Sequence, residues 1–170
     1  MSAIPGGIAM KLSKILMLAL TALLGHGLAQ GQNLLVKSTG QKLYLPVYSH
    51  VWHGDINKEG KPFKALMSVA VSIRNTDQLR SIKLTSAAYY DTEGKKIKDY
   101  IASPRVILPM ATYELFLPWA DDAGGSGANF IMEWQSDQES SQPVVEAIHA
   151  NLPAGRSVIF VTSAYVLPGQ

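Results

Sequence analysis

An all-β fold is predicted for this chain, in the form of an antiparallel β-sandwich. Three observations predict it. Apolar and polar residues alternate in short runs, Gly and Pro punctuate these runs at regular spacing, and no stretch beyond residue 41 has the period of a helix. The chain contains no Cys, which excludes disulfides, thiolate metal sites and cysteine nucleophiles.

The clearest strand signal lies in the middle of the chain. Residues 67–73 carry an apolar side chain at every second position, which predicts that Val71 faces the core. Asn75-Thr76-Asp77 favours a turn, because these side chains bond their own backbone. A second strand follows over 82–90 and a third begins after the turn at Gly94. The pattern therefore predicts a β-meander.

The remaining strands are predicted from the same alternation. The first covers 43–52, where both faces are apolar or aromatic and Pro46 favours an edge position or a bulge. Further strands are expected over 96–101, 112–117, 129–135, 144–150 and 158–166, with a polar turn at 136–143. We assign 42–168 to a single sandwich domain.

Residues 10–29 have the organisation of a signal peptide. Lys11 and Lys14 form the positive region, 15–24 is a short apolar region, and small residues up to Ala29 suit a signal peptidase. The apolar run is too short to span a bilayer comfortably. We expect cleavage after Ala29 and a periplasmic or secreted protein with no stable membrane span after cleavage. The alternatives are a retained N-terminal membrane anchor and a buried helix.

The predicted signal peptide therefore covers 1–29, with Met10 as an alternative start, and 30–41 forms a flexible lead-in. Of the fifteen basic residues, Lys11 and Lys14 leave with the signal peptide, so thirteen remain against thirteen acidic residues. Binding to nucleic acid requires a clustered basic surface, and this balance argues against such a partner.

Three potential metal ligands lie close together at the end of the first strand. On an extended strand His50 points to one face, whereas His53 and Asp55 point to the other. A turn at Gly54 is needed to bring all three onto one divalent metal ion. The alternative is that His50 packs among aromatic residues while His53 and Asp55 shape the turn.

The glycine run 124–128 is predicted to be a tight structural turn. A nucleophile elbow at Ser126 requires a helix after it, and a strand follows instead. The Lys of a phosphate-binding loop is also missing. Asp121 and Asp122 lack the spacing of a calcium loop and are expected to be solvated.

Aromatic residues divide into a core set and a candidate surface set. Trp134 and either Tyr89 or Tyr90 are expected to fill the core, whereas Trp52 and Trp119 flank loops. We expect a binding surface where residues 48–55 meet the 119–129 loop, since sandwich folds place recognition on loops at their ends. Its candidate residues are Tyr48, His50, Trp52, His53, Asp55, Trp119, Ser126 and Asn129.

Four segments resemble the motifs of a bacterial family of exported proteins known only as domain of unknown function 3124. They are YSHVWHGD (48–55), SIRNTD (72–77), YYDTEGK (89–95) and GGSGANFIMEW (124–134). The predicted meander also resembles immunoglobulin-like domains of bacterial surface proteins, which implies an immunoglobulin-like sandwich. The family resemblance implies export and a fold, and it implies no activity.

Two functional hypotheses follow from the sequence. The first is an exported, non-enzymatic binding or accessory domain that contacts a protein or a glycan and needs no cofactor. The alternative is a periplasmic metal-binding or metal-dependent protein that uses His50, His53 and Asp55.

Overall fold

Residues 36–168 are described by a computed structural model, and they belong to one compact unit, Leu35–Gln170. The predicted signal peptide, 1–29, lies outside the described residues and stays a prediction. Every regular element among the described residues is a β-strand. The strands are β1 (Lys37–Pro46), β2 (His50–Ile56), β3 (Pro62–Leu66), β4 (Ser68–Arg74), β5 (Ile82–Tyr90), β6 (Lys96–Asp99), β7 (Arg105–Ile107), β8 (Thr112–Leu117), β9 (Asn129–Ser141), β10 (Val144–Asn151), β11 (Val158–Ser163) and β12 (Tyr165–Val166).

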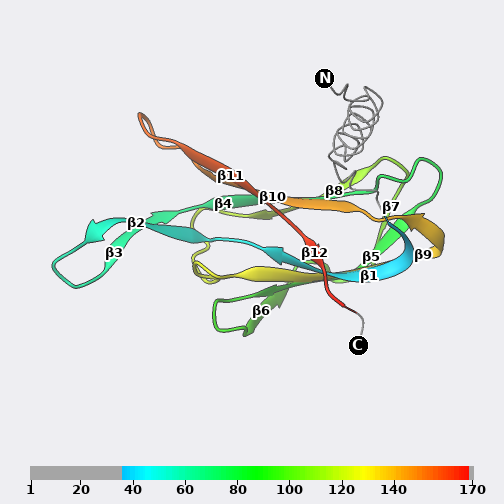
Figure 1. The fold of residues 1–170 in the computed structure, drawn as a ribbon, viewed down its shortest axis with the longest axis horizontal. Coiled ribbons are helices and arrows are strands. Elements are labelled where there is room, and N and C mark those ends of the chain that lie inside the picture. The colour runs from blue at the N-terminus through cyan, green and yellow to red at the C-terminus, as the bar shows by residue number, and fades with distance from the viewer. Residues whose placement is uncertain (1–35, 169–170) are drawn as a thin grey trace, which may run out of the picture. The chain divides into compact units, whose positions relative to one another are not determined.

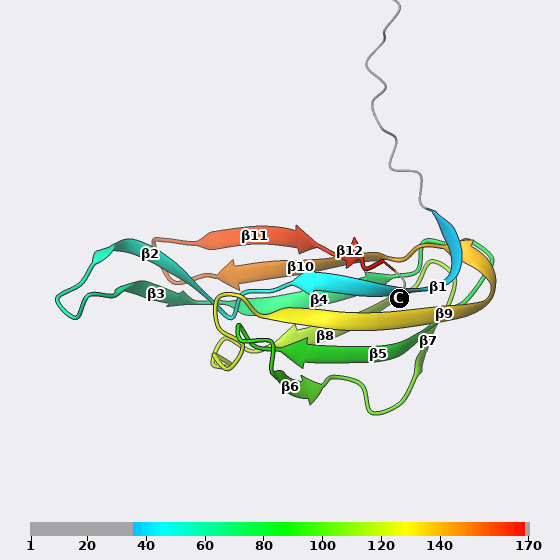
Figure 2. The same cartoon turned by 60° about the horizontal axis from the view of Figure 1, so that its bottom comes forward.

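The strands form two large sheets and a separate two-stranded arm (Figure 1). The first sheet has the order β12-β1-β9-β5-β6, with β7 also paired to β5, and the second has the order β11-β10-β4-β8. The arm consists of β2 and β3, which extend beyond the ends of the sheets in both views (Figure 2). All pairs are antiparallel, which confirms the all-β prediction. Over 36–168 the chain forms no helix that is long and apolar enough to cross a membrane.

One apolar core joins the inward faces of the two large sheets. On the second sheet Val71 is fully buried, as its place in the alternation predicts. On the first sheet Tyr89, Phe130 and Trp134 are the largest members of this core. Burial of such large side chains is the main stabilising term of a domain that has no disulfide.

The predicted meander is wrong at its first connection. β4 and β5 lie in different sheets, so the segment between them crosses from one sheet to the other. Both strands have an apolar inward face, and these faces meet across the core instead of lying side by side. A β-bulge between Leu84 and Ser86 then shifts the alternation of β5, so that Ala87 and Tyr89 join the core. The predicted pairing beyond Gly94 is confirmed, because β5 and β6 form a hairpin.

The first predicted strand, 43–52, is in fact two strands. β1 ends at Pro46, β2 begins at His50, and β2 pairs with β3 instead of continuing the first sheet. β1 also begins earlier than expected, because residues 37–41 of the expected lead-in pair with β9. β12 pairs only with Leu43 and Tyr44 of β1, so Pro46 lies beyond this pairing. The lack of an N–H group at Pro46 therefore costs no hydrogen bond with β12.

The polar segment 136–143 contributes to a strand where a turn was expected. β9 continues to Ser141 and pairs there with the start of β1. Asp77 holds this extension, since its carboxylate accepts hydrogen bonds from the Ser141 N–H (3.1 Å) and the Ser140 hydroxyl (3.3 Å). The polar composition of 136–143 by itself favours a turn. The strand forms because Asp77, which is distant in sequence, bonds to this segment.

Candidate functional site

The two segments expected to form a binding surface do lie against each other. The Val47 N–H donates to the Ala128 carbonyl at 2.9 Å, and the Ser49 N–H donates to the Gly125 carbonyl at 3.1 Å. The Ser49 hydroxyl donates to the same Gly125 carbonyl at 3.0 Å. These bonds fix the base of the arm to the glycine-rich loop before β2 leaves the body of the domain.

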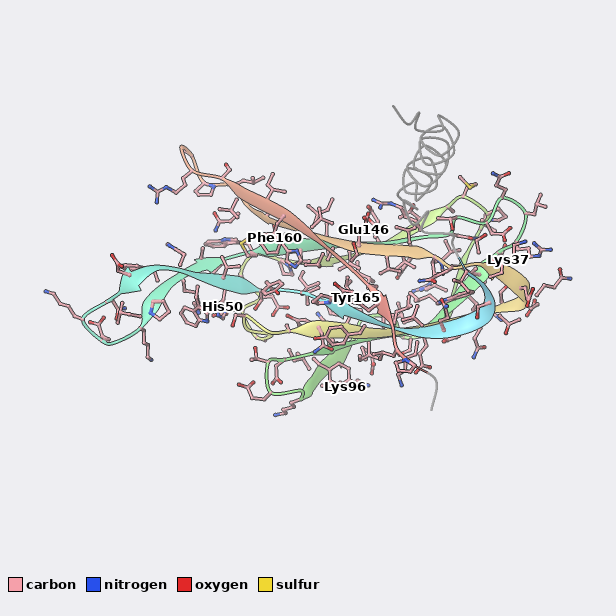
Figure 3. All side chains as sticks on the ribbon, viewed as in Figure 1. Lys37, His50, Lys96, Glu146, Phe160 and Tyr165 are labelled. Carbon is pink, nitrogen blue, oxygen red and sulfur yellow. The ribbon has the colours of Figure 1, made fainter. Side chains whose placement is uncertain are left out.

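A small polar cluster completes the base of the arm. His50 Nδ1 lies 2.9 Å from Asp122 Oδ1, and the Lys64 ammonium pairs with the other oxygen of Asp122. His50 belongs to β2 and Lys64 to β3, so one carboxylate contacts both strands of the arm. Figure 3 labels His50 at the point where the arm joins the sheets.

The charge of Asp122 is stabilised by these contacts. The hydrogen bond from Lys64 lowers the pKa of Asp122 most, and the hydrogen bond with His50 lowers it further. The imidazole of His50 is almost fully buried, and its Nε2 atom has no hydrogen-bond partner among residues 36–168. The ring also lies edge-on to Trp52, with 4.8 Å between the ring centroids.

The hypothesised metal ligands do not come together. His50 is buried against Asp122, whereas His53 and Asp55 are exposed farther along the arm. The strand pairing places His53 opposite Phe63, and the two rings stack with 6.1 Å between their centroids. This pair lies on the face of the arm opposite to His50. In the part of the chain that the structure describes, no three His, Cys, Asp or Glu residues form a group able to hold a metal ion. The cluster of His50, His53 and Asp55 is therefore not a metal site in this structure.

The arm exposes large apolar side chains on both faces. Trp52 is 49% exposed, Phe63 is 52% exposed, and Ile56 near the tip is also exposed. Trp52 lies on the face of His50 and opposite Lys64, whereas Phe63 lies on the other face. A two-stranded ribbon has little core of its own, so these side chains gain little burial within the arm itself.

The glycine-rich loop is a close-packed turn, as predicted. A Cβ atom at Gly124 would overlap the Tyr89 hydroxyl and would come within 2.7 Å of the Ala128 Cβ. Gly125 has a φ of +79°. Thr92 ties this loop to the turn after β5, because its hydroxyl donates to the Gly124 carbonyl at 3.1 Å. Burial raises the pKa of the Tyr89 phenol beneath the loop, and the charge of Asp121 raises it further.

The other predicted surface residues occupy different settings. Trp119 is exposed at the start of the loop, as expected, and Ser126 is half-buried within it. Asn129 is the first residue of β9 and pairs with Pro46 and Tyr90. The candidate site is therefore the base of the arm and the adjoining loop.

His149 lies beneath the start of the arm and is fully buried. Its Nε2 atom accepts a hydrogen bond from the Tyr48 N–H at 3.1 Å, and its ring stacks on Phe160 with 4.4 Å between centroids. Burial lowers the pKa of His149 to about 4, because the charged imidazolium is costly in this setting. The sequence alone did not connect His149 with Tyr48, which is 101 positions away.

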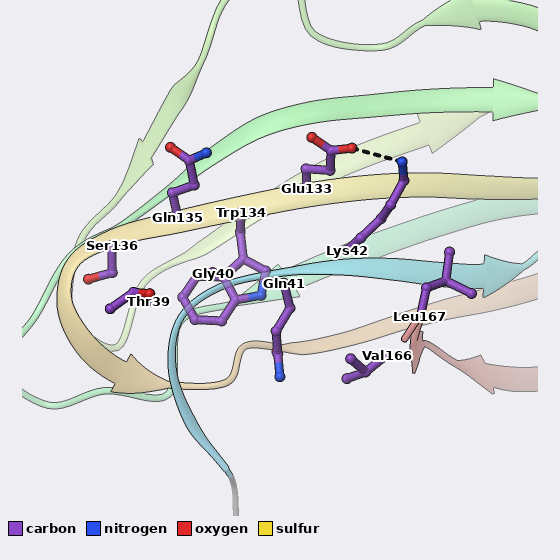
Figure 4. A pocket seen from close by; sticks show the side chains of 10 residues that line it. All are labelled: Thr39, Gly40, Gln41, Lys42, Glu133, Trp134, Gln135, Ser136, Val166 and Leu167. Carbon is purple, nitrogen blue, oxygen red and sulfur yellow. Dashed lines mark ion pairs between the residues drawn. The ribbon is translucent and has the colours of Figure 1, made fainter. Parts of the chain in front are cut away.

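A second concave region lies away from the arm, at the edge of β1 (Figure 4). This hollow of about 660 Å³ is lined by Thr39, Gly40, Gln41, Lys42, Glu133, Trp134, Gln135, Ser136, Val166 and Leu167. Lys42 and Glu133 form an ion pair of 3.1 Å beside it. Gln41 Oε1 and Trp134 Nε1 are buried there, and neither has a hydrogen-bond partner within residues 36–168. None of the predicted site residues lines this hollow.

Two residues of the candidate site were missed by the sequence reasoning. Nothing in the sequence distinguishes Lys64 from a solvent-exposed lysine without a partner. Asp122 was expected to be solvated, yet it is the residue that joins the arm to the loop. Only the pairing of β2 with β3 places Lys64 beside His50 and Asp122.

Comparison with known proteins concerns the family and the fold. No curated protein matches the sequence. A crystal structure of Thermotoga maritima 1070 is similar over 76% of this chain and 97% of that chain, with 12% sequence identity and a TM-score of 0.42. A likeness of this degree carries no argument about function. The family model described as "Protein of unknown function (DUF3124)" matches residues 40–167, and on this match the protein belongs to that family.

Proposed function

We propose that this protein is an exported, non-enzymatic binding or accessory domain that contacts a protein or a glycan through the β2–β3 arm. One observation carries the proposal. The arm exposes Trp52 and Phe63, while His50, Asp122 and Lys64 fix its base to the body of the domain. Exposed aromatic side chains on a fixed support lose little conformational entropy on binding, and such residues dominate the energetics of recognition.

The chemistry at the base of the arm favours binding over catalysis. His50 and Asp122 are arranged like the base and orienting carboxylate of a hydrolase. In such an enzyme the second ring nitrogen contacts a nucleophile, but His50 Nε2 has no partner among the described residues. The adjacent Ser49 hydroxyl donates to a backbone carbonyl. We therefore assign the cluster a positioning role.

Site-specific photocrosslinking in the native host tests this function. A photoreactive phenylalanine analogue replaces Phe63 on the arm, and a matched control replaces Leu79, which is exposed in the loop after β4. We expect an adduct after irradiation from position 63 and none from position 79, with its protein or glycan content identified by mass spectrometry. His53→Ala should weaken this adduct without lowering the melting temperature, because His53 lies beside Phe63 on the same face of the arm. Equal adducts from positions 63 and 79 would contradict the proposal.

Export rests on the signal-peptide pattern of 10–29. Sequencing the N-terminus of protein from an extracytoplasmic fraction tests it. The expected first residue is Gln30, and a start at or before Ile15 would indicate a retained anchor instead.

Sheet membership supports a variant of the immunoglobulin-like sandwich as the finer description of the fold. In a constant-type domain, strands A, B, E and D form one sheet and C, F and G the other. If β1, β4, β5, β8, β9 and β10 correspond to A, B, C, E, F and G, then the pairs β4–β8 and β5–β9 match B–E and C–F. The first and last of these strands are exchanged, since β1 pairs with β9 and β10 pairs with β4.

A further inference from the structure

The free edges of the two large sheets differ in how well they are protected. Proteins discourage pairing at sheet edges with charged residues, proline or very short strands. β6 has the sequence KIKD, β7 follows Pro104 and begins with Arg105, β12 has only two residues, and β8 carries Glu114 in its middle. β11 has six residues with the sequence VIFVTS, which contains neither a charge nor a proline. It is the unprotected edge among the described strands.

The inner side of β11 is already anchored, so its backbone is held in place. Phe160 stacks on His149 with only 4° between the ring planes. The Thr162 hydroxyl donates to the Pro46 carbonyl at 2.6 Å. β11 ends the strand order of the second sheet, so none of the described strands pairs with its far edge (Figure 2). A row of backbone N–H and C=O groups is therefore available to one more extended strand.

We propose that this edge pairs with the same strand of a second copy of this chain, giving a two-fold symmetric dimer with a continuous eight-stranded sheet. Antiparallel self-pairing must keep outward side chains opposite outward side chains. Centring the two-fold axis on Phe160 meets this condition, because it places Ile159 of one copy opposite Val161 of the second copy, twice. Ile159 is 61% exposed and Val161 is 53% exposed in the single chain.

The same register satisfies the hydrogen-bond pattern. Backbone N–H and C=O groups point alternately to the two sides of a strand. Residues whose backbone groups point to the free edge are therefore separated by two positions. Pairing about a central residue matches each edge-pointing residue with another edge-pointing residue of the second copy. Phe160 then lies opposite Phe160 of the second copy, which is a favourable aromatic cross-strand pair.

Charge also permits a second copy as the occupant. The nearest charged side chain before β11 is Arg156, and this register places it opposite the uncharged Ala164 of the second copy. No like charges meet along the paired strands. A foreign strand with charges at these positions would lie against uncharged side chains, whereas β11 of a second copy is uncharged at every position.

The outer face of the sheet supports the same arrangement. Val161 pairs with Ile148, Ile148 with Ala70, and Ala70 with Phe116, so an uncharged row crosses all four strands. In the dimer this row continues through Ile159 of the second copy. Cross-strand apolar contacts of this kind stabilise pairing between neighbouring strands.

Sedimentation velocity on protein that comprises residues 1–170 tests the proposal. We expect a monomer–dimer equilibrium between about 1 and 100 µM, the range of a modest interface. The double substitution Ile159→Lys and Val161→Lys places like charges opposite each other in both pairs. It should raise the dimer dissociation constant at least about tenfold, since directly opposed like charges are destabilising.

Two further variants make the test specific to register and edge. Ile159→Glu with Val161→Lys places opposite charges in both pairs, and its dissociation constant should return to within about threefold of the parent. Phe116→Lys changes the same outer face at the far edge of the sheet and should leave the dimer intact. Hydrogen exchange of β11 amides should slow as protein concentration rises.

Four outcomes would overturn the proposal. The first is a parent protein that stays monomeric over this range, and the second is a double-lysine variant that dimerises like the parent. The third is a dissociation constant of the Ile159→Glu, Val161→Lys variant as high as that of the double-lysine variant. The fourth is an equally high dissociation constant of the Phe116→Lys variant. The last would indicate face-to-face packing of the outer sheet surfaces. Circular dichroism checks that each variant is folded.

Discussion

Asp77 and Asp122 lie beyond opposite ends of β4, and their oxygens are bonded to different kinds of donors. Asp77 follows β4 and accepts from the backbone N–H groups of Leu79 (2.9 Å), Arg80 (3.0 Å) and Ser141 (3.1 Å). Asp122 contacts the side chains of His50 and Lys64 at the base of the arm. Asp77 is buried, whereas Asp122 is exposed on one side.

This difference separates an architectural cluster from a positioning cluster. Around Asp77, almost every polar group is satisfied by the backbone, as a structural turn requires. Asn75 completes that end, because its amide donates to the carbonyls of Arg80, Ile107 and Leu108. Around Asp122, the ion pairs and hydrogen bonds join side chains to one another. They hold β2 and β3, which carry the exposed aromatic residues Trp52 and Phe63. Mutation should therefore unfold the first end and loosen the second.

The largest effect is expected from Asn75→Ala. It leaves three carbonyls without their shared donor, that of Ile107 in a buried hydrogen bond and those of Arg80 and Leu108 in partly buried ones, and we expect a loss of about 3–4 kcal/mol in the free energy of unfolding. Urea denaturation measures this loss. Thr76→Ala is the control, because it removes one hydrogen bond, to the Gln142 carbonyl, and should cost about 1 kcal/mol. Equal losses for the two variants would contradict the architectural role of Asn75.

Acid should weaken the two ends in different pH ranges. Folding lowers the pKa of His149 from 6.5 to about 4, so the stability that neutral His149 contributes is complete above pH 6.5 and is lost toward pH 4. The loss is about 3 kcal/mol by linkage. The backbone bonds from Leu79 and Ser141 lower the pKa of Asp77 from 3.8 to about 2, so its contribution is lost only as the pH falls through that lower range.

Denaturation at stepped pH, combined with hydrogen exchange, separates these two phases. Exchange near Tyr48 should rise first, because its N–H donates to His149. His149→Phe should remove the upper phase and leave the lower one. An upper phase that persists in this variant would show that another group controls it.

A smaller effect is expected from Gly124→Ala. The new methyl group overlaps the Tyr89 hydroxyl, and overpacking of this kind should cost about 2 kcal/mol. Thermal and urea unfolding measure the loss. Gly127→Ala is the control, because its Cβ would lie 3.2 Å from Thr92 Cγ2, where a small adjustment suffices. A Gly124→Ala protein as stable as the Gly127→Ala protein would show that the loop is not closely packed.

The smallest effect on stability is expected from Asp122→Asn. Losing a partly exposed carboxylate should cost about 1 kcal/mol overall. Hydrogen exchange across β2 and β3 should nevertheless rise, because the bond from Lys64 to the carboxylate is weakened. Lys96→Gln serves as the control, since it removes the exposed Lys96–Asp99 pair without touching the arm. Unchanged exchange in the arm would contradict the positioning role of Asp122.

Local patterns in the sequence determined the all-β class, the inward face of β4 and the turn at Asn75-Thr76-Asp77. These features depend on residues within a few positions of one another, where side-chain alternation and self-bonding turns act directly. The exposure of Trp52 and Trp119, the burial of Trp134, and the contact between 48–55 and the glycine-rich loop also agree with what the sequence predicted.

Only the tertiary structure decided which strands share a sheet and which side chains meet. Alternation shows that β4 and β5 each have an apolar face, but it is the same whether two such strands pair or face each other across a core. His50 meets Asp122 across 72 positions of sequence, and Lys64 joins them across 58. The hypothesised metal cluster failed for the same reason. His50 and His53 are close in sequence, but their side chains lie on opposite faces of one strand. The partner of His50 is Asp122, which belongs to a distant loop.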